Sequence, residues 1–506
     1  MSGEFPMSWK AVPLVSPSGP SPARCPAHAG QDDAERAEAG EGPAPGGHLE
    51  ELRREPLGLL RRSAKESAHR LARLDTGPGA CLVVSDPDAV DVVLTDHDAA
   101  FFKPKMERWK QVLGENVLTS EGPAWARSRR RSMRITGARY VRRAARVVAE
   151  VTDERLRSWA GTGAVGVDGA ADSPRSPCIP GSHDIPDIHE EMRTLTLAAV
   201  LRHLCGTDDD FDLRAFGRHL RTVMECIHAL ESAPAGAEPS ARVERAFAHA
   251  AGELRAAVLR LVASHAGGDD LVGLLTAPPD TASDDGRAAE PLTPDQVCDE
   301  VLAHLIAGHE STATALAWSL LLLSRDADVT RRVRTEIGTT VGGRAPGPAD
   351  LAGMPLLQAV FTEALRLCPP AWTIMRATGR PCELSGVRLP AGAVLLASPY
   401  SIQRSGRWFP RPDEFLPDRW LGDAAAGAPR YAYFPFGGGR RSCPGRMLAQ
   451  VTAGVVLTRV LQGFRIEPVG EPPTADVGII LRPSPGTRLR AVPLRRESAG
   501  QREESP

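Results

Sequence analysis

The sequence predicts a mainly α-helical protein with a minor β portion. Helical patterns begin near Leu49 and continue, with interruptions, to Ser264, and a long helix follows from about residue 293. Beyond about residue 380 the pattern changes to short strands and turns, and no internal repeat is visible. We therefore expect one large folded unit with two tails. The predicted parts are a disordered arm at residues 1–48, a folded domain at residues 49–490 and a tail at residues 491–506.

Local signals define the first elements. Residues 1–48 are rich in Pro, Gly, Ala and Ser and lack apolar periodicity, which is typical of a disordered arm. The run ACLVV at residues 80–84 predicts a short strand, and Ser-Asp-Pro at residues 85–87 can cap the helix that follows. Residues 161–185 break the helical pattern and predict a surface loop, and residues 278–290 form a second polar stretch.

The longest predicted helix has a well-defined start. Thr293 is a good N-cap, Pro294 suits the first helical position, and Gln296 completes a capping box. No proline interrupts residues 297–323, and roughly thirty helical residues span about 45 Å, the width of the whole fold. We therefore expect this helix to cross the molecule. A last helix is predicted over residues 444–461.

Composition excludes several classes of protein. Of the 506 residues, 25% are charged and 42% are hydrophobic, which excludes a collagen-like, low-complexity or wholly disordered chain. A net charge of −2 argues against a nucleic-acid binder that is basic overall. No window approaches the ~20 apolar residues of a membrane span, and prolines interrupt the N-terminus, so a cytoplasmic location is predicted. The nine cysteines are far apart and form no CxxC pair, so neither a disulfide framework nor a structural zinc site is indicated.

One glycine-rich segment carries most of the functional signal: FPFGGGRRSCPG at residues 434–445. Three consecutive glycines permit positive φ and close approach, so backbone amides can point at the sulfur of Cys443. Pro444 is predicted to open a helix whose positive end lies against the same sulfur. Both effects lower the pKa of a thiol, so the pattern predicts a thiolate at Cys443.

That segment resembles the haem-ligand loop of the cytochrome P450 monooxygenases. The family pattern FxxGxRxCxG is matched at Phe436, Gly439, Arg441, Cys443 and Gly445. The resemblance implies the cytochrome P450 fold as a single large haem domain of the soluble bacterial type. It also implies haem b, with Cys443 as the axial ligand of the iron.

Three further motifs follow the family's order, and the resemblance covers roughly residues 50–490. They are ExxR at Glu363 and Arg366, a PERF-like segment FLPDRW that contains Arg419, and a WxxxR-like segment at Trp125 and Arg129. Glu363 and Arg366 lie three apart on a helix and can pair, and Arg419 can close a charge network with them. The resemblance assigns propionate contacts to Trp125, Arg129, Arg376 and Arg441, and further cofactor contacts to Ala307, Gly308, Phe436 and Gly445. Where the family often has His-Arg, this chain has Gln403-Arg404, and position 403 is given no role.

The long helix carries a segment, LIAGHEST at residues 305–312, that resembles the family's AGxET(T/S) motif. Gly308 lacks a side chain, so a flat macrocycle and dioxygen can approach the backbone there. The Ser311 hydroxyl can bond the Ala307 carbonyl four residues back and open a notch in the helix. The resemblance assigns catalytic roles to Glu310, Ser311 and Thr312, with Glu310 as a proton source. The family most often has Thr where this chain has Ser311, which puts tight coupling of electrons to product in doubt.

Redox partners are also implied. Only 63 residues follow Cys443, too few for a reductase domain, so electrons from NAD(P)H are expected through a separate ferredoxin or flavodoxin and its reductase. Four arginines recur at helical spacing and could form a basic docking face or simply a solvated helix face: Arg127, Arg130, Arg131 and Arg134. We expect a monomer that binds O2 and no nucleic acid.

The expected substrate pocket is mostly apolar. Its predicted lining residues are Val117, Leu118, Ala303, Ala307, Ala371, Trp372 and Thr373. A bulky hydrophobic substrate of terpenoid, polyketide or fatty acyl type follows, in bacterial secondary metabolism. Alternatives are a haem-thiolate enzyme for oxidative coupling or ring formation, a haem-binding sensor without turnover, and a cysteine hydrolase, although no histidine is tied by motif to Cys443.

Overall fold

The computed structural model describes residues 47–494, apart from 69, 78, 96–99, 162–181, 207–210, 232–239, 266, 269, 278–290 and 423–426. The predicted arm up to residue 46, most of the predicted loop at 161–185 and the polar stretch 278–290 lie outside the described residues, as do Cys25 and Cys178. The first described helix begins at Gly47 and the last strand ends at Pro493. Each predicted domain boundary, 49 and 490, therefore falls inside a regular element.

The described part of the chain is mainly helical, as predicted. Its α-helices are α1 (Gly47–Arg54), α2 (Pro56–Glu66), α3 (Pro87–Thr95), α4 (Glu107–Leu113), α5 (Gly122–Ile135), α6 (Ala138–Gly161), α7 (Ile188–Cys205), α8 (Leu213–Glu231), α9 (Ala241–Ser264), α10 (Leu271–Thr276), α11 (Pro294–Arg325), α12 (Ala327–Thr340), α13 (Pro348–Ala352), α14 (Pro355–Leu367), α15 (Pro399–Ile402) and α16 (Arg446–Gly463). Short 3₁₀ helices are η1 (Pro417–Trp420), η3 (Arg430–Ala432) and η4 (Gly439–Arg441). None of the described helices is long and apolar enough to cross a lipid bilayer.

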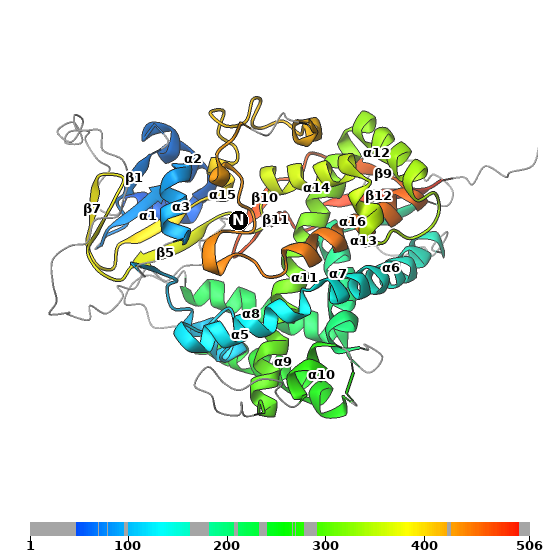
Figure 1. Ribbon diagram of the computed structural model, residues 1–506, viewed down its shortest axis with the longest axis horizontal. Coiled ribbons are helices and arrows are strands. Elements are labelled where there is room, and N and C mark those ends of the chain that lie inside the picture. The colour runs from blue at the N-terminus through cyan, green and yellow to red at the C-terminus, as the bar shows by residue number, and fades with distance from the viewer. Residues whose placement is uncertain are drawn as a thin grey trace, which may run out of the picture.

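Within the described residues, the β portion consists of short strands in four small sheets. The strands are β1 (Leu71–Leu74), β2 (Cys81–Val84), β3 (Phe101–Phe102), β4 (His183–Ile185), β5 (Ile374–Thr378), β6 (Cys382–Leu384), β7 (Val387–Leu389), β8 (Val394–Ala397), β9 (Phe464–Val469), β10 (Ala475–Val477), β11 (Leu481–Pro483) and β12 (Arg488–Pro493). The largest sheet has the order β1-β2-β8-β5-β3, in which only the β2–β8 pair is parallel. Together with α1, α2 and α3 it forms the blue and yellow part of the molecule in Figure 1.

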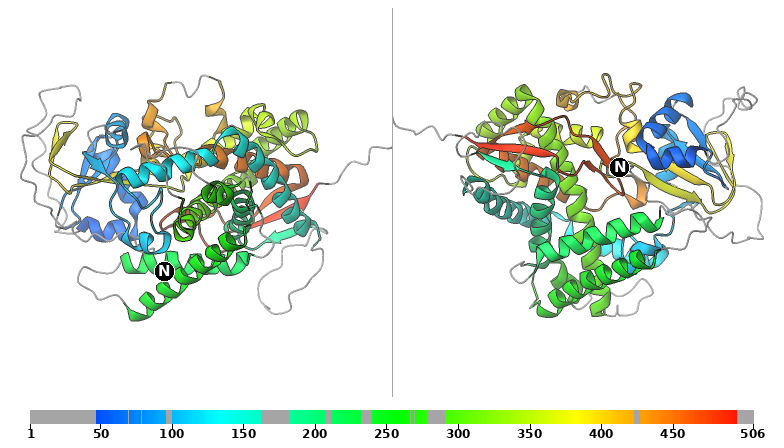
Figure 2. Two further views of the ribbon diagram at one scale, coloured as in Figure 1. Left: turned by 60° about the horizontal axis from the view of Figure 1, so that its bottom comes forward. Right: turned by 180° about the vertical axis from the view of Figure 1, so that it is seen from behind.

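Helix α11 runs through the middle of the molecule (Figures 1 and 2). Its predicted start is confirmed: the Thr293 hydroxyl accepts from the Gln296 amide at 3.3 Å, and the Gln296 side chain accepts from the Thr293 amide at 2.9 Å. The helix packs against α7, α9, α14 and α16, and most of its side chains are buried. A helix that is apolar on most of its circumference belongs in the core of a large domain. α11 is therefore the element around which the other helices are arranged.

Two predicted boundaries differ from the structure. The last helix begins at Arg446, with Gly445 as its N-cap, instead of at Pro444, because residues 444 and 445 form a turn before it. The end of the predicted loop at 161–185 is strand β4, which pairs with β12 from the far end of the chain. A three-residue strand that depends on so distant a partner has no local signal in the sequence.

Candidate active site

A cavity of about 410 Å³ lies between α11 and the glycine-rich segment around Cys443. Ala307, Gly308 and Ser311 line it from α11, and Phe436 and Cys443 line it from the opposite segment. Its size falls within the ~300–1,000 Å³ typical of cofactor and small-molecule sites. The long helix and the cysteine loop, 135 residues apart at Gly308 and Cys443, thus form two walls of one site.

Two close approaches explain the glycines of the cysteine loop. Gly439 has φ +61°, and a Cβ there would lie 1.8 Å from the Leu94 carbonyl oxygen at the end of α3. A Cβ on Gly438 would lie 2.4 Å from the ring of Tyr431. No side chain fits at either position, so the loop can pack against α3 and η3 only with glycine. The turn closes where the Cys443 amide donates to the Phe436 carbonyl at 2.9 Å.

Cys443 differs from the other cysteines that the structure describes. Six of those are buried, whereas Cys443 is exposed to the cavity. Burial raises the pKa of the Cys443 thiol, and the amides of Gly445 and Arg446 and the charge of Arg129 offset only part of that rise. The predicted lowering by the loop amides is thus present, but burial outweighs it. A metal ion bound to the sulfur would stabilise the thiolate instead.

Four cationic side chains line the same cavity: Lys103, Arg129, Arg376 and Arg441. None of the described residues that line it is acidic, although Glu121 pairs with Arg441 from outside the lining. Burial lowers the pKa of Lys103 to about 8, and the neighbouring charges of Arg441 and Arg376 contribute to the shift. So many cations around one cavity favour an anionic occupant. A flat group with two carboxylates and a metal that binds sulfur satisfies both the cations and Cys443, so these residues fit haem.

Three of the four cations were predicted from the sequence, and the structure brings them to the cysteine loop. Arg129 donates to the Ser442 carbonyl at 2.6 Å. Arg441 lies over the ring of Trp125 at 4.3 Å and pairs with Glu121. These contacts hold α5, which carries the WxxxR-like motif, against the segment that carries Cys443.

Lys103 was not predicted. It follows β3, and the register that pairs Phe102 with Ala377 sets Lys103 one step further along, beside Arg376. Its Nζ donates to the Leu118 carbonyl at 2.7 Å. The only sequence feature that distinguishes Lys103 is composition, because it is one of five lysines among the 61 basic residues. A rare residue type on its own does not indicate a site.

The α11 wall carries the predicted Ser311 contact, within a helix that is continuous through residues 305–312. The Ser311 hydroxyl donates to the Ala307 carbonyl at 2.9 Å, as predicted, and Ser311 and Thr312 both line the cavity. A Cβ on Gly308 would lie 3.4 Å from the Val200 side chain of α7. That is an ordinary van der Waals distance, so the packing of α7 on α11 does not require a glycine at this position.

Glu310 lies on the other side of α11 and does not line the cysteine cavity. It borders a second cavity of about 220 Å³ together with Arg221, Asp476 and Arg482. Arg193 of α7 donates from Nε to the Glu310 carboxylate at 2.7 Å. Burial alone would raise the pKa of Glu310, but Arg193 and two histidines nearby hold that pKa below its ordinary value. The residue expected to feed protons inward is thus an ionised carboxylate held away from the first cavity.

The predicted substrate residues divide into two groups. Those that line the cavity are Val117, Leu118, Ala303, Ala307 and Ala371. Trp372 and Thr373 do not line it, which corrects the prediction. The indole of Trp372 is buried and donates to the Gly478 carbonyl at 3.0 Å, so it packs against the β10–β11 hairpin. The bulky aromatic side chain expected in the pocket belongs to the protein core.

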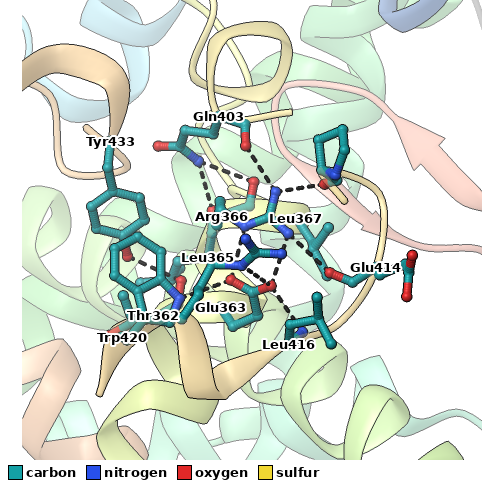
Figure 3. A network of polar contacts seen from close by, with 12 residues as sticks. Thr362, Glu363, Leu365, Arg366, Leu367, Gln403, Glu414, Leu416, Trp420 and Tyr433 are labelled. Carbon is teal, nitrogen blue, oxygen red and sulfur yellow. Dashed lines mark hydrogen bonds and ion pairs between the residues drawn. The ribbon is translucent and has the colours of Figure 1, made fainter. Parts of the chain in front are cut away.

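The predicted charge network is present and fully buried at its centre (Figure 3). Glu363 accepts from Arg366 through two bonds of 2.8 Å and from Arg419 at 3.0 Å. It also accepts from the Leu416 amide at 3.0 Å and the Trp420 indole at 2.8 Å. The carboxylate of α14 therefore holds η1 and the chain before it in place, which is the structural role predicted for this network.

Arg366 uses all five of its N–H donors. Beyond Glu363 they reach the carbonyls of Gln403, Pro412 and Glu414 at 2.6–3.0 Å. Gln403, which was given no role, donates to the Leu365 and Arg366 carbonyls (Figure 3). It also accepts from the Phe434 amide at 2.9 Å. A buried glutamine thus connects α14 to the start of the cysteine loop. The neutral amide supplies both donor and acceptor, which an imidazole can also do.

Three members of the predicted basic face are exposed on α5: Arg127, Arg130 and Arg134. The fourth, Arg131, is turned inward and bonds the buried Glu300 of α11 at 2.6 Å. Its inclusion in the face was wrong, because helical spacing does not reveal a buried carboxylate on a neighbouring helix.

Comparison with known proteins identifies the family. The model of the family "Cytochrome P450" matches residues 271–490. Cyclooctatin synthase of Streptomyces melanosporofaciens is 32% identical over 462 residues, which cover 89% of this chain and 92% of that protein. The chain belongs to the cytochrome P450 family. It is a haem-thiolate enzyme of the monooxygenase class.

Two more relatives carry oxygenase names. Cyclooctat-9-en-7-ol 5-monooxygenase of the same species is 31% identical, over 85% of this chain and 90% of that protein. Pentalenene oxygenase of Streptomyces avermitilis is 28% identical, over 86% and 93%. Among solved structures, the haem domain of cytochrome P450DA superposes with a TM-score of 0.76 at 22% identity, over 89% of this chain and 96% of that one. The last comparison confirms the fold.

Proposed function

We propose that this monooxygenase inserts one oxygen atom from O2 into a cyclic terpenoid hydrocarbon or alcohol. The observation that carries the proposal is the apolar lining on the α11 side of the cysteine cavity, from Leu118, Ala303, Ala307 and Ala371. Small alanines beside one larger leucine leave room for a bulky ring system, and apolar walls favour a substrate without charge. Relatives that act on cyclooctat-9-en-7-ol and, by name, on pentalenene support this class.

Haem held by Cys443 supplies the activation of dioxygen that a thiolate ligand favours. The residues of this chain would bind the cofactor, orient the substrate and transfer protons. Arg129, Arg376 and Arg441 would hold the carboxylates of the cofactor by charge-assisted hydrogen bonds. The apolar wall would orient the substrate and exclude water. The Ser311 hydroxyl, anchored on the Ala307 carbonyl, would hold and pass a proton at the α11 wall of the cavity.

The role of Glu310 in this scheme is indirect. Its carboxylate is bound to Arg193 and faces the second cavity, so it would deliver protons only after exchange of that ion pair. Cytoplasmic location and a monomeric state stay predictions from the sequence.

Electrons would come from NAD(P)H through a separate ferredoxin or flavodoxin with its reductase. The exposed arginines of α5 support an acidic partner, since α5 contacts the cysteine loop through Arg129 and Ser442. Such a surface steers an oppositely charged protein toward the segment that carries Cys443.

Three measurements test the proposal. The reduced carbon-monoxide difference spectrum of the wild type should show the red-shifted Soret band of thiolate-ligated haem, and Cys443→Ala should abolish it. A spin-state titration should then show cyclic sesquiterpenes and diterpenes binding more tightly than linear fatty acids. Turnover under ¹⁸O2 should place one labelled atom in the product. A coupled or cyclised product without label would replace oxygen insertion by oxidative ring formation.

A further inference from the structure

The segment between α4 and α5, residues 114–121, carries two of the residues that line the cavity, Val117 and Leu118. At its start the segment is held to α11. The Glu115 amide donates to the Asp299 carboxylate at 2.9 Å, and a Cβ on Gly114, which has φ +64°, would lie 2.0 Å from that carboxylate. Only glycine permits this approach, so the start of the segment is fixed.

On its inner side the segment is held by two cations of the haem cavity. Lys103 donates to the Leu118 carbonyl at 2.7 Å. Both terminal nitrogens of Arg441 donate to the Ser120 carbonyl at 3.2 Å. These are bonds to backbone carbonyls, so they fix the path of the chain regardless of which side chains the segment carries.

Lys103 and Arg441 reach this segment from different parts of the fold. Lys103 follows β3 at the edge of the largest sheet, whereas Arg441 lies two residues before Cys443. An ammonium has three N–H donors and a guanidinium five, so each can bond a backbone carbonyl and a carboxylate together. The same side chains that fit the carboxylates of haem thus hold the segment that faces the substrate.

We propose that Lys103 is a positioning residue that couples haem binding to the position of the substrate-lining segment 114–121. The inference rests on haem binding at this site and not on the class of substrate. Haem carboxylates would neutralise the crowded cations and hold the Lys103 ammonium where it meets the Leu118 carbonyl. Because coupling is reciprocal, a well-ordered segment would in turn retain haem.

Matched variants distinguish coupling of haem binding to the segment 114–121 from a purely electrostatic contribution of Lys103 to haem binding. Lys103→Met removes both functions of the ammonium, and Lys103→Gln is a polar second choice should that protein fold poorly. Arg376→Met removes a cation from the same cavity, but the carbonyl that Arg376 bonds is that of its own neighbour, Met375, outside the segment. Lys105→Met, two residues on and exposed, controls for loss of a lysine near β3.

Two quantities are measured on the purified holoproteins. One is the rate of haem transfer to excess apomyoglobin, and the other is amide hydrogen exchange of peptides that cover residues 114–121. We expect Lys103→Met to accelerate both, by about tenfold each, the order of effect of losing one charge-assisted hydrogen bond. Arg376→Met should accelerate haem transfer alone, and Lys105→Met neither.

Several results would overturn the coupling. If Lys103→Met accelerates haem transfer but leaves exchange of the segment unchanged, Lys103 acts by charge only. If amide exchange of the segment becomes faster and haem transfer does not, Lys103 stabilises the segment but does not couple it to haem. If amide exchange of the segment is equally fast in Lys103→Met and Arg376→Met, the faster exchange is a general consequence of weaker haem binding and not of the Lys103 bond. None of these readouts uses a substrate, so the result does not depend on the proposed substrate class. A wild type without thiolate-ligated haem would be evident from its spectrum before the test begins.

Discussion

Arg366 and Glu363 form a two-bond ion pair, with both bonds at 2.8 Å and neither side chain exposed to solvent. A second Arg–Glu pair with the same spacing, Arg411 and Glu414, lies on the surface with more than half of each side chain exposed. Spacing therefore does not determine the strength of such a pair. Burial determines how much the protein loses when one partner of the pair is removed, because an unpaired charge inside the protein has no water to solvate it.

Glu363→Gln should lower the free energy of unfolding by about 3–5 kcal/mol, since it leaves Arg366 buried without its counter-charge. Urea denaturation followed by circular dichroism measures the change. Glu414→Gln is the matched control and should have little effect, because that pair is solvated. Similar losses in the two variants would mean that the buried network is not a main source of stability.

Ser311→Ala should divert electrons from product to hydrogen peroxide. The hydroxyl is the only group of that side chain that can hold a proton beside the Ala307 carbonyl. Product formed per NAD(P)H consumed should fall by about tenfold, while Ser311→Thr should keep or improve the wild-type ratio. Ser324→Ala, near the end of the same helix, serves as the control. An unchanged ratio in Ser311→Ala would remove this hydroxyl from proton delivery.

Arg193→Gln should destabilise the protein by about 3–5 kcal/mol, because it leaves the Glu310 carboxylate buried without its cation. Without Arg193, burial should raise the pKa of Glu310 above its ordinary value, so acidification should protonate Glu310 in the folded protein first and reduce the stability difference between the variant and the wild type. The double variant with Glu310→Gln should recover part of the loss. Arg221→Gln, which removes an exposed arginine paired with Glu190, is the control. Additive effects of the two buried substitutions would rule out direct coupling between them.

Acid should destabilise the fold through buried histidines. Burial lowers the pKa of His203 to about 4, below the 6.5 of a solvated histidine, so the unfolded chain takes up a proton first as pH falls. His203 thus favours folding above pH 6.5, and that contribution, about 3 kcal/mol at most, is lost between pH 6.5 and 4. His203→Leu should reduce the difference in unfolding free energy between pH 7 and pH 5. His249→Leu, at an exposed position of α9, should leave that difference as it is in the wild type.

The exposed arginines of α5 should govern reduction by the partner protein. Arg127→Glu combined with Arg134→Glu reverses charge on that face without touching the inward-facing Arg131. Stopped-flow reduction by an acidic ferredoxin should become slower and less dependent on salt, since steering depends on opposite charge. The same pair of changes on α9, Arg242→Glu and Arg245→Glu, provides a control with equal change in net charge. Equal slowing in both double variants would leave α5 without a special role.

Local sequence was sufficient for several features. The Thr293–Gln296 capping box, the Ser311 bond to the Ala307 carbonyl and the Glu363–Arg366–Arg419 network were all predicted, because each depends on spacing within a helix or on a motif read as a unit. Gln403 and Lys103 were missed, because their roles come from carbonyls that only the fold brings to them.

The sequence by itself determined the cysteine loop, the long central helix and the class of chemistry. These depend on glycine conformations, helix capping and a fixed pattern of residue types along a short stretch of chain. Tertiary structure alone decided which way a side chain faces: Glu310 toward the second cavity, Trp372 into the core, Arg131 onto Glu300 and Lys103 into the haem cavity. Helical periodicity gives the angle of a residue around its own helix, but the neighbour found at that angle comes from elements far away in the chain.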